Sequence, residues 1–236
     1  MTEIIKRIGM SSNTTVKRFA TLLRWPVRFG QLKLLRLRKG DPLVDFIVAI
    51  QKERGFMMWP DEMAFLATCA KTVTNVRGHI AEVGVASAGS AKLLAEFKGN
   101  KELYLFDTFD GLPETKKIDG ALRKGQYKYS LEEIKKYLSP HTNIFYYKGI
   151  FPDSVEGGVA AIQNKKFSLV HLDVDLYEST LQALEFFYPR VEKNGLIISH
   201  DYSTLEGVRQ AFAEYFDNKP ECVIELPTSQ SLVVKI

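Results

Sequence analysis

An apolar stretch that ends in two acidic residues constrains this chain more than any other part of its sequence. Residues 167–173 (Phe-Ser-Leu-Val-His-Leu-Asp) have the composition of a buried strand, and Asp175 follows two positions after Asp173. A carboxylate at the end of a buried strand is costly unless a partner compensates its charge. In an open α/β sheet this edge is also where ligands bind. We therefore predict that both acids are site residues, sharing one face if the extended geometry continues past Asp173.

Strands and helices alternate through the C-terminal two thirds of the chain. The other segments typical of strands are 78–85, 101–107, 143–149 and 195–201. Helical patterns follow or separate them at 91–97, 130–138 (with Ser130 as N-cap and Glu133 completing a capping box), 153–162, 178–191 and 205–216. This alternation predicts a parallel sheet with right-handed crossovers. Residues 221–226 and 231–236 flank Pro-Thr-Ser-Gln, so we expect an antiparallel hairpin to end the sheet.

The N-terminal part is basic and differs from the rest. Residues 1–54 hold twelve Lys or Arg and four Asp or Glu, whereas the remaining residues hold twenty and twenty-four. Pro26 and Gly30 interrupt residues 13–40, which predicts that this stretch is not one helix. Its leucines, aromatics and basic residues suit a bilayer interface, a lid, a dimer contact or a solvated extension. Asp41 is a plausible N-cap, with Pro42 at the first position of the next helix.

Length and composition fit one core with an added helical segment. We divide the chain into a basic arm (1–40), a helical lid segment (41–77) and a catalytic domain (78–236). Cys69 and Cys222 are far apart and outside any CxxC pattern, so neither a disulfide framework nor a zinc site is expected, and a reducing compartment is the simplest interpretation. Neither a membrane-spanning run nor a secretory signal is indicated, which predicts a cytoplasmic protein, with peripheral membrane contact through the arm left open.

The turn after the first strand of the sheet has the residues of a cofactor site. Glu82-x-Gly84-x4-Gly89-Ser90 permits close approach of a ligand to the backbone, and the following helix offers free N–H groups. Asp107 ends the next strand, where an acid can accept hydrogen bonds from a ribose. The spacing is not GxGxxG and the chain ends in a hairpin, so a single nucleoside such as S-adenosyl-L-methionine fits better than NAD.

Longer motifs extend this interpretation. Glu82-Val-Gly-Val, Asp107-Thr-Phe-Asp-Gly-Leu-Pro-Glu and His171-Leu-Asp-Val-Asp-Leu-Tyr-Glu-Ser-Thr make the chain resemble the macrocin O-methyltransferase family, as do His200-Asp-Tyr and the closing Val-Val-Lys-Ile. The resemblance covers residues 41–236. It implies a Rossmann-like class I methyltransferase sheet that uses S-adenosyl-L-methionine and magnesium to methylate sugar hydroxyls.

The resemblance also implies site residues. The expected metal ligands are Asp173, His200 and Asp201. The expected catalytic residues are Asp173 and Asp175, with Asp175 acting as the general base. The expected cofactor-binding residues are Glu82, Gly84, Val85, Gly89, Ser90, Asp107, Thr108, Phe109 and Gly149. His200 departs from the acid more usual there. His200 could bind a softer ion than Mg²⁺, such as Mn²⁺. It could instead contact the metal ligands without binding the metal, or act as a base itself. A third alternative is that the site does not hold a metal well.

Several points stay open at this stage. The acceptor is expected to be a small-molecule or glycan hydroxyl, with a phenol or catechol as the alternative, and nucleic acid is not expected. A non-catalytic cofactor-binding or membrane-surface protein is a further alternative, and a homo-oligomer is open. The loop at 115–129 could cover the acceptor. Met57, Met58 and Trp59 suit a core better than a cofactor site, and His171 is expected to be buried and hydrogen-bonded.

Overall fold

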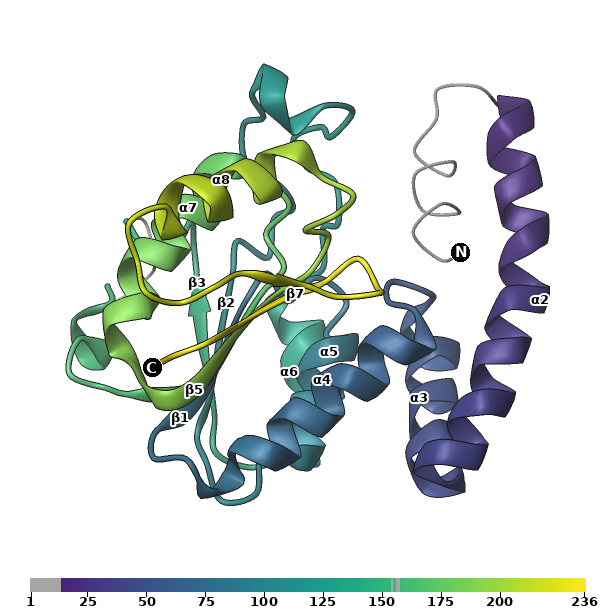
Figure 1. The fold of residues 1–236 in the computed structure, drawn as a ribbon, viewed down its shortest axis with the longest axis horizontal. Helices are drawn as coiled ribbons and strands as arrows, with labels where there is room; N and C mark the ends of the chain where they lie inside the picture. Colours follow the sequence, from purple (N-terminus) through teal and green to yellow (C-terminus); the bar gives the residue numbers. More distant parts are fainter. Residues whose placement is uncertain (1–13, 154, 156–157) are drawn as a thin grey trace.

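The computed structural model describes residues 14–153, 155 and 158–236. Its centre is a seven-stranded sheet with the order β3-β2-β1-β4-β5-β7-β6 (Figure 1). The strands are β1 His79–Val83, β2 Leu103–Asp107, β3 Ile144–Lys148, β4 Phe167–Leu172, β5 Val191–Ser199, β6 Ile224–Glu225 and β7 Ser231–Val234. The first five run parallel, and β7 is antiparallel to both β5 and β6. The predicted parallel sheet with a closing hairpin is confirmed.

Helices cover both faces of the sheet. They are α2 Thr14–Lys39, α3 Asp41–Arg54, α4 Pro60–Thr72, α5 Gly89–Phe97, α6 Leu131–Leu138, α7 Tyr177–Phe187 and α8 Glu206–Phe216. Because successive side chains of a strand point to opposite faces, Ile80 packs with α3, α4 and α5, whereas Ala81 belongs to the cluster under α7 and α8. The hydrophobic cluster that contains Ile80 runs continuously from α3 and α4 into the sheet. The division into arm, lid and catalytic domain stays a prediction.

The strand order places a binding crevice at a defined edge. The chain moves outward from β1 to β2 and β3, and then returns to the other side of β1 with β4. The helices that follow the neighbouring strands β1 and β4 therefore diverge, and ligands bind in the gap at the carboxyl ends of these strands. All the predicted site residues lie at or just beyond the carboxyl ends of β1 to β5, apart from Glu82 inside β1.

The first correction concerns the arm. Residues 14–39 form one helix, α2, with Pro26 inside it, so the prediction that Pro26 and Gly30 break the stretch is wrong. A proline removes one backbone hydrogen bond, but α2 is held against α3 and α4 beyond that point. The Arg28 Nε donates to Gln51 Oε1 at 2.9 Å and the Gln31 Nε2 to Asp61 Oδ2 at 2.7 Å. These tertiary contacts outweigh the local preference. Residues 1–13 lie outside the described part.

Three helix boundaries also differ from the prediction. Gly40 is the N-cap of α3 and Asp41 its first residue, without a side-chain cap. The described residues of 153–162 contain only a short 3₁₀ turn, Ala160–Ile162, because Gly158 with φ of 69° ends any helical run there. The helix predicted to reach residue 191 ends at Phe187, since a 3₁₀ turn that contains Pro189, Tyr188–Arg190, follows it and β5 begins at Val191. The N-cap Ser130 is confirmed, but the Glu133 carboxylate pairs with Arg54.

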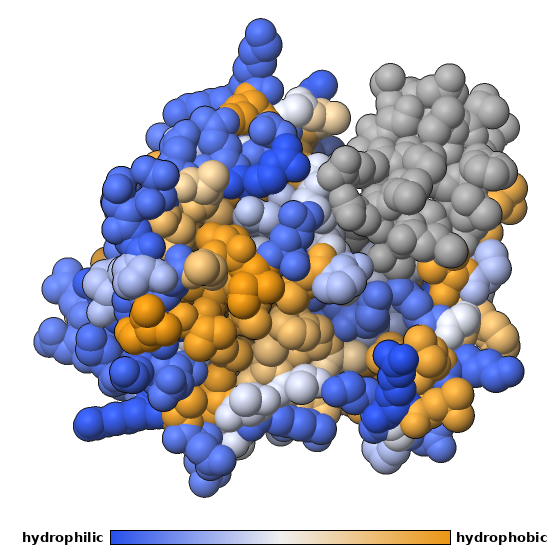
Figure 2. Space-filling model, in the orientation of Figure 1, coloured by the Kyte–Doolittle hydropathy of each residue, from blue (hydrophilic) through white to orange (hydrophobic). Residues whose placement is uncertain are grey.

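Figure 2 shows one face of the molecule, on which a central apolar region is bordered by polar residues. The exposed apolar residues of the C-terminal segment include Ile224, Val234 and Ile236. The described helices include none that is long and apolar enough to cross a membrane.

Candidate functional site

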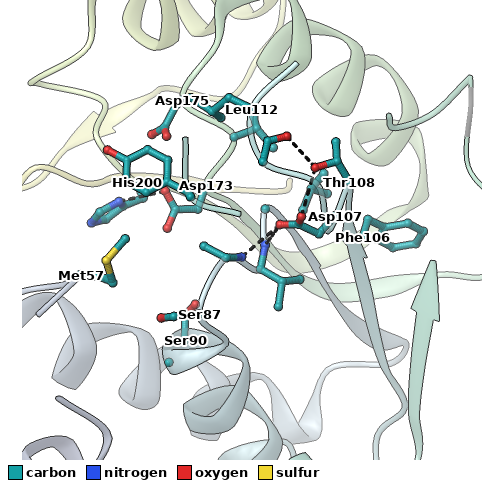
Figure 3. A pocket seen from close by; sticks show the side chains of 18 of the residues that line it. Met57, Ser87, Ser90, Phe106, Asp107, Thr108, Leu112, Asp173, Asp175 and His200 are labelled. Atoms are coloured by element: carbon teal, nitrogen blue, oxygen red, sulfur yellow. Dashed lines mark hydrogen bonds and ion pairs between the residues drawn. The ribbon is translucent and has the colours of Figure 1, made fainter. Parts of the chain in front are cut away.

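One cavity of about 1190 Å³, including its open mouth, occupies the carboxyl edge of the sheet (Figure 3). Its walls come from the ends of β1, β2, β3, β4 and β5 and from the segment that joins α3 to α4. Eleven of the predicted site residues line it: Gly84, Val85, Gly89, Ser90, Asp107, Thr108, Gly149, Asp173, Asp175, His200 and Asp201. The fold therefore brings the two predicted subsites, for cofactor and for metal, into one cavity.

Gly84 is required where β1 and β4 meet. Its φ is 87°, and a Cβ there would lie 1.9 Å from the carbonyl oxygen of Asp173. The backbone N–H of Asp173 donates to the carbonyl of Val83 at 2.9 Å, so the two strand ends are in direct contact. Glycine at this position thus lets Asp173 approach the first turn of the pocket.

Asp107 holds that turn in place. Its Oδ2 accepts the backbone N–H groups of Val85 at 2.7 Å and Ala86 at 3.0 Å, and its Oδ1 accepts the N–H of Phe109 at 2.6 Å. Ala86 and Ala88 have φ of 42° and 64°, a conformation that side chains with a Cβ rarely adopt. The carboxylate compensates this strain, and its Oδ1 also lies 3.5 Å from the Thr108 hydroxyl.

Two predicted cofactor residues, Glu82 and Phe109, do not line the cavity. Glu82 and His171 are fully buried in neighbouring strands, with His171 Nδ1 2.8 Å from Glu82 Oε1. Burial raises the pKa of the Glu82 carboxyl, and the hydrogen bonds from His171 and Ser90 oppose this shift. The expectation of a buried, hydrogen-bonded His171 is confirmed. Phe109 is also buried, in the core beside α5, and contributes its backbone N–H to the Asp107 network.

The expected metal ligands form a compact cluster. One ligand atom from each of Asp173, His200 and Asp201 lies within 4.8 Å of the others. His200 Nδ1 is 3.0 Å from Asp173 Oδ1 and 3.2 Å from Asp201 Oδ2. The histidine side chain is only 5% exposed, whereas those of Asp173 and Asp201 are 24% and 15% exposed. The imidazole therefore lies beneath the two carboxylates.

A buried glutamate lies behind this histidine, and sequence reasoning missed it. Glu62 in α4 is 1% exposed, and its Oε2 lies 3.4 Å from His200 Nε2. The same carboxylate accepts the backbone N–H of Trp59 at 2.8 Å and the hydroxyl of Ser229 at 2.6 Å. The only sequence signal is an acid three residues after Trp59 at a helix start, which by itself indicates a cap.

The donor set fits a divalent cation. With Nε2 facing Glu62, His200 directs Nδ1 towards the two carboxylates, which is the arrangement of a metal-ligating histidine backed by an acid. Two carboxylates and one imidazole suit Mn²⁺, Fe²⁺ or Zn²⁺ better than Mg²⁺, which prefers oxygen ligands.

Asp175 and the loop at 115–129 complete the mouth. β4 ends at Leu172 and Asp175 has φ of 60°, so the extended geometry does not continue past Asp173 as the two-residue spacing required. Both acids line the cavity because the chain turns there. Tyr127 lines it too, and burial together with the charges of Asp175, Asp201 and Asp173 raises its pKa to about 12.

The interpretation of the methionines as core residues is half right. Met58 is buried, whereas Met57 is 40% exposed, and both line the cavity. Figure 3 shows the Met57 side chain reaching towards His200 and Asp173 across the opening. An apolar pair before a helix carries no local signal that distinguishes these two environments.

Comparison with known proteins supports one family. The model of the macrocin O-methyltransferase family matches residues 55–225. The 8-demethyl-8-(2,3-dimethoxy-alpha-L-rhamnosyl)-tetracenomycin-C 4'-O-methyltransferase of Streptomyces olivaceus is 29% identical over 169 residues, 64% of this chain and 63% of that protein. The demethyldecarbamoylnovobiocin O-methyltransferase of Streptomyces niveus is 26% identical over 158 residues, 60% of this chain and 59% of that protein. The chain thus spans about three fifths of the length of these relatives.

A solved structure shows the same fold. The O-methyltransferase NovP superposes with a TM-score of 0.67 at 22% sequence identity, over 76% of this chain and 81% of NovP. The matched family segment begins in the linker before α4 and ends in β6, so it contains the whole parallel sheet and every residue of the acidic cluster. The chain belongs to the macrocin O-methyltransferase family.

Proposed function

We propose that this protein is an O-methyltransferase that transfers a methyl group from S-adenosylmethionine to a hydroxyl of a sugar or glycoconjugate, assisted by a divalent metal. The proposal rests on one observation: the turn at Gly84 that Asp107 holds in place and the cluster of Asp173, His200 and Asp201 line the same cavity. Family membership supports methyl transfer. The rhamnosyl group in the name of the Streptomyces olivaceus relative supports a sugar acceptor.

The cofactor half of the cavity would be formed by β1, β2 and the start of α5. Gly84, Val85, Gly89 and Ser90 offer backbone and hydroxyl groups, and Asp107 offers a carboxylate for the ribose. When bound, S-adenosylmethionine would supply an electrophilic methyl group, which would leave the sulfur for the acceptor oxygen. Thr108 and Gly149 extend the same wall. Glu82 and Phe109 would act by supporting that wall.

The acid cluster would activate the acceptor. An aliphatic hydroxyl is a poor nucleophile because its pKa lies far above 7. A divalent cation held by Asp173, His200 and Asp201 would supply positive charge beside that hydroxyl and lower its pKa. Asp175 lines the same cavity and would accept the proton. Glu62 would hold His200 in the orientation that presents Nδ1.

The wall formed by Tyr127, Met57 and Met58 would limit access of water to the reacting atoms. Tyr127 would act as a neutral phenol at physiological pH, since its pKa is raised to about 12. A neutral hydroxyl beside a sugar can both donate and accept a hydrogen bond.

Calorimetry and product analysis test the proposal together. The full chain is titrated with S-adenosylmethionine, and methyl transfer is followed by mass spectrometry with nucleotide sugars, glycans and phenols as acceptors. We expect cofactor binding, and Asp175→Asn should retain it while turnover falls by roughly 100- to 10,000-fold, because the proton acceptor is lost. Asp217→Asn, an exposed acid after α8, should change neither.

Each part of the proposal has its own contrary outcome. The absence of cofactor binding at millimolar concentration would refute methyl transfer. Turnover that survives EDTA would refute metal assistance alone, and activity confined to phenols would replace the acceptor class. Binding of cofactor with no turnover on any acceptor would favour a non-catalytic protein.

A further inference from the structure

Helix α2 presents an apolar stripe to the outside. Leu22, Trp25, Phe29 and Leu37 are between 70% and 81% exposed. Their spacing of three, four and eight residues keeps them near one side of a helix with 3.6 residues per turn. Apolar side chains this exposed, on one stripe of a long helix, indicate a surface that meets something other than water.

The opposite side of α2 is fastened to the body. Arg28 and Gln31 bind side chains of α3 and α4, and Leu35 packs against the core cluster. The Lys39 Nζ donates to Thr68 Oγ1 at 3.3 Å at the end of the helix. Residues 28, 31, 35 and 39 follow helical spacing too, so the stripe cannot turn inward without breaking these contacts.

Charge decides between two occupants of the stripe. Residues 14–39 contain eight Lys or Arg and no Asp or Glu. Exposed Lys33 lies between Phe29 and Leu37 on the stripe, and exposed Arg38 follows Leu37 in the sequence. A symmetric contact between two copies of α2 would oppose two strongly positive helices. An anionic lipid headgroup layer complements the same charges while its acyl region accepts the apolar stripe.

We propose that α2 docks this protein on the surface of an anionic membrane. Leu22, Trp25, Phe29 and Leu37 enter the interface, and the basic side chains extend along it to the headgroups. At 26 residues α2 is about 39 Å long and lies along the surface. The helix also touches the site, because Arg28 binds Gln51, which lines the cavity and donates to the carbonyl of Met58.

Vesicle binding of the full chain tests the proposal independently of methyl transfer. Vesicles of phosphatidylcholine alone and of phosphatidylcholine with phosphatidylglycerol are compared by co-sedimentation. We expect binding to the anionic vesicles that weakens as salt rises. Tryptophan emission should shift to the blue on binding, a change that reports Trp25 because Trp59 is only 1% exposed. Trp25→Phe should abolish the shift.

A charge-matched pair of variants locates the surface. Lys33→Glu/Arg38→Glu should reduce vesicle binding at least about tenfold. Lys136→Glu/Lys193→Glu makes the same charge change at exposed positions on α6 and β5, and should retain binding. Equal loss in both variants would overturn the docking surface, as would lack of binding to anionic vesicles. A concentration-dependent dimer lost in the α2 variant, without vesicle binding, would assign the stripe to a second copy.

Discussion

At the scale of single residues, the Glu62–His200 contact most affects the proposed chemistry. Asp173 and Asp201 alone would form an oxygen site, whereas the imidazole adds a nitrogen donor. A histidine can present either ring nitrogen, and the acid behind it determines which one faces the cavity. Glu62 faces Nε2 and the carboxylates face Nδ1. With the proposed function, the metal preference would therefore depend on a residue that does not line the cavity.

We expect Glu62→Gln to weaken Mn²⁺ binding about 10- to 100-fold, because the amide holds the imidazole less firmly than the carboxylate does. Calorimetry with Mn²⁺ measures this effect, and the affinity for S-adenosylmethionine should stay unchanged. Glu221→Gln replaces another buried glutamate far from the cavity and should leave Mn²⁺ affinity unaltered. Unchanged Mn²⁺ affinity in Glu62→Gln would show that the contact is structural only.

At the scale of elements, the loop at 115–129 is anchored to the sheet side by one buried acid. Asp119 is 6% exposed, and its Oδ1 accepts the backbone N–H of Tyr177, the first residue of α7, at 3.0 Å. Its Oδ2 accepts the N–H of Lys116 at 2.6 Å. The backbone N–H of Leu112 donates to the carbonyl of Gln126 at 2.8 Å, and both residues line the cavity. These contacts hold Tyr127 at the mouth of the cavity, so the base of the loop forms a fixed wall there.

Asp119→Ala should cost about 1 to 2 kcal/mol of stability, since two partly buried N–H groups lose their acceptor. We also expect the KM for the acceptor to rise more than the KM for S-adenosylmethionine, because Tyr127 lies close enough to Asp175, Asp201 and Asp173 for their charges to raise its pKa. Urea unfolding and steady-state kinetics measure the two effects. Asp217→Ala serves as an exposed control. Equal changes in both KM values would contradict an acceptor-specific role for the loop.

At the scale of the whole molecule, a buried carboxylate closes the sheet at the end of the chain. Glu221 accepts hydrogen bonds from Lys235 Nζ at 2.9 Å and from the Tyr188 hydroxyl at 2.7 Å. Burial alone would raise the pKa of Glu221, but these bonds and those from backbone N–H groups outweigh it and bring the pKa to about 2. Through Lys235 and Tyr188, Glu221 ties the end of the chain after β7 to the 3₁₀ turn that follows α7.

This pairing predicts how stability depends on pH. The folded-state pKa lies below the ordinary value of 4.5, so Glu221 stabilises the fold fully above about pH 5 and loses this contribution as the pH falls towards 2. Glu221→Gln should be less stable at pH 7 and should approach the unmodified protein in stability near pH 2, as measured by urea unfolding at several pH values. The exposed Glu185→Gln should keep the original dependence, and a variant that differs equally from the unmodified protein at both pH values would contradict the assignment.

Much of the fold follows from local patterns. Strands β1 to β4 lie within the predicted segments, whereas β5 begins four residues before the predicted start, at Val191. The closing hairpin is marked by Pro227 and its polar neighbours and was predictable too. That Gly84, Asp107 and Asp173 lie at one cavity was predictable, because the carboxyl ends of parallel strands converge. These inferences need only the period of the apolar residues and the direction of the strands.

The tertiary structure decided what depends on distant neighbours. Pro26 weakens a helix locally, and only the contacts of α2 with α3 and α4 keep the helix whole. Met57 and Met58 are alike in sequence but differ in exposure. Glu62 and His200 are 138 positions apart, and no spacing rule joins them. Local periodicity sets which segments become strands and helices, whereas the packing of these segments determines which nitrogen of His200 faces the acids and which side of α2 faces outward.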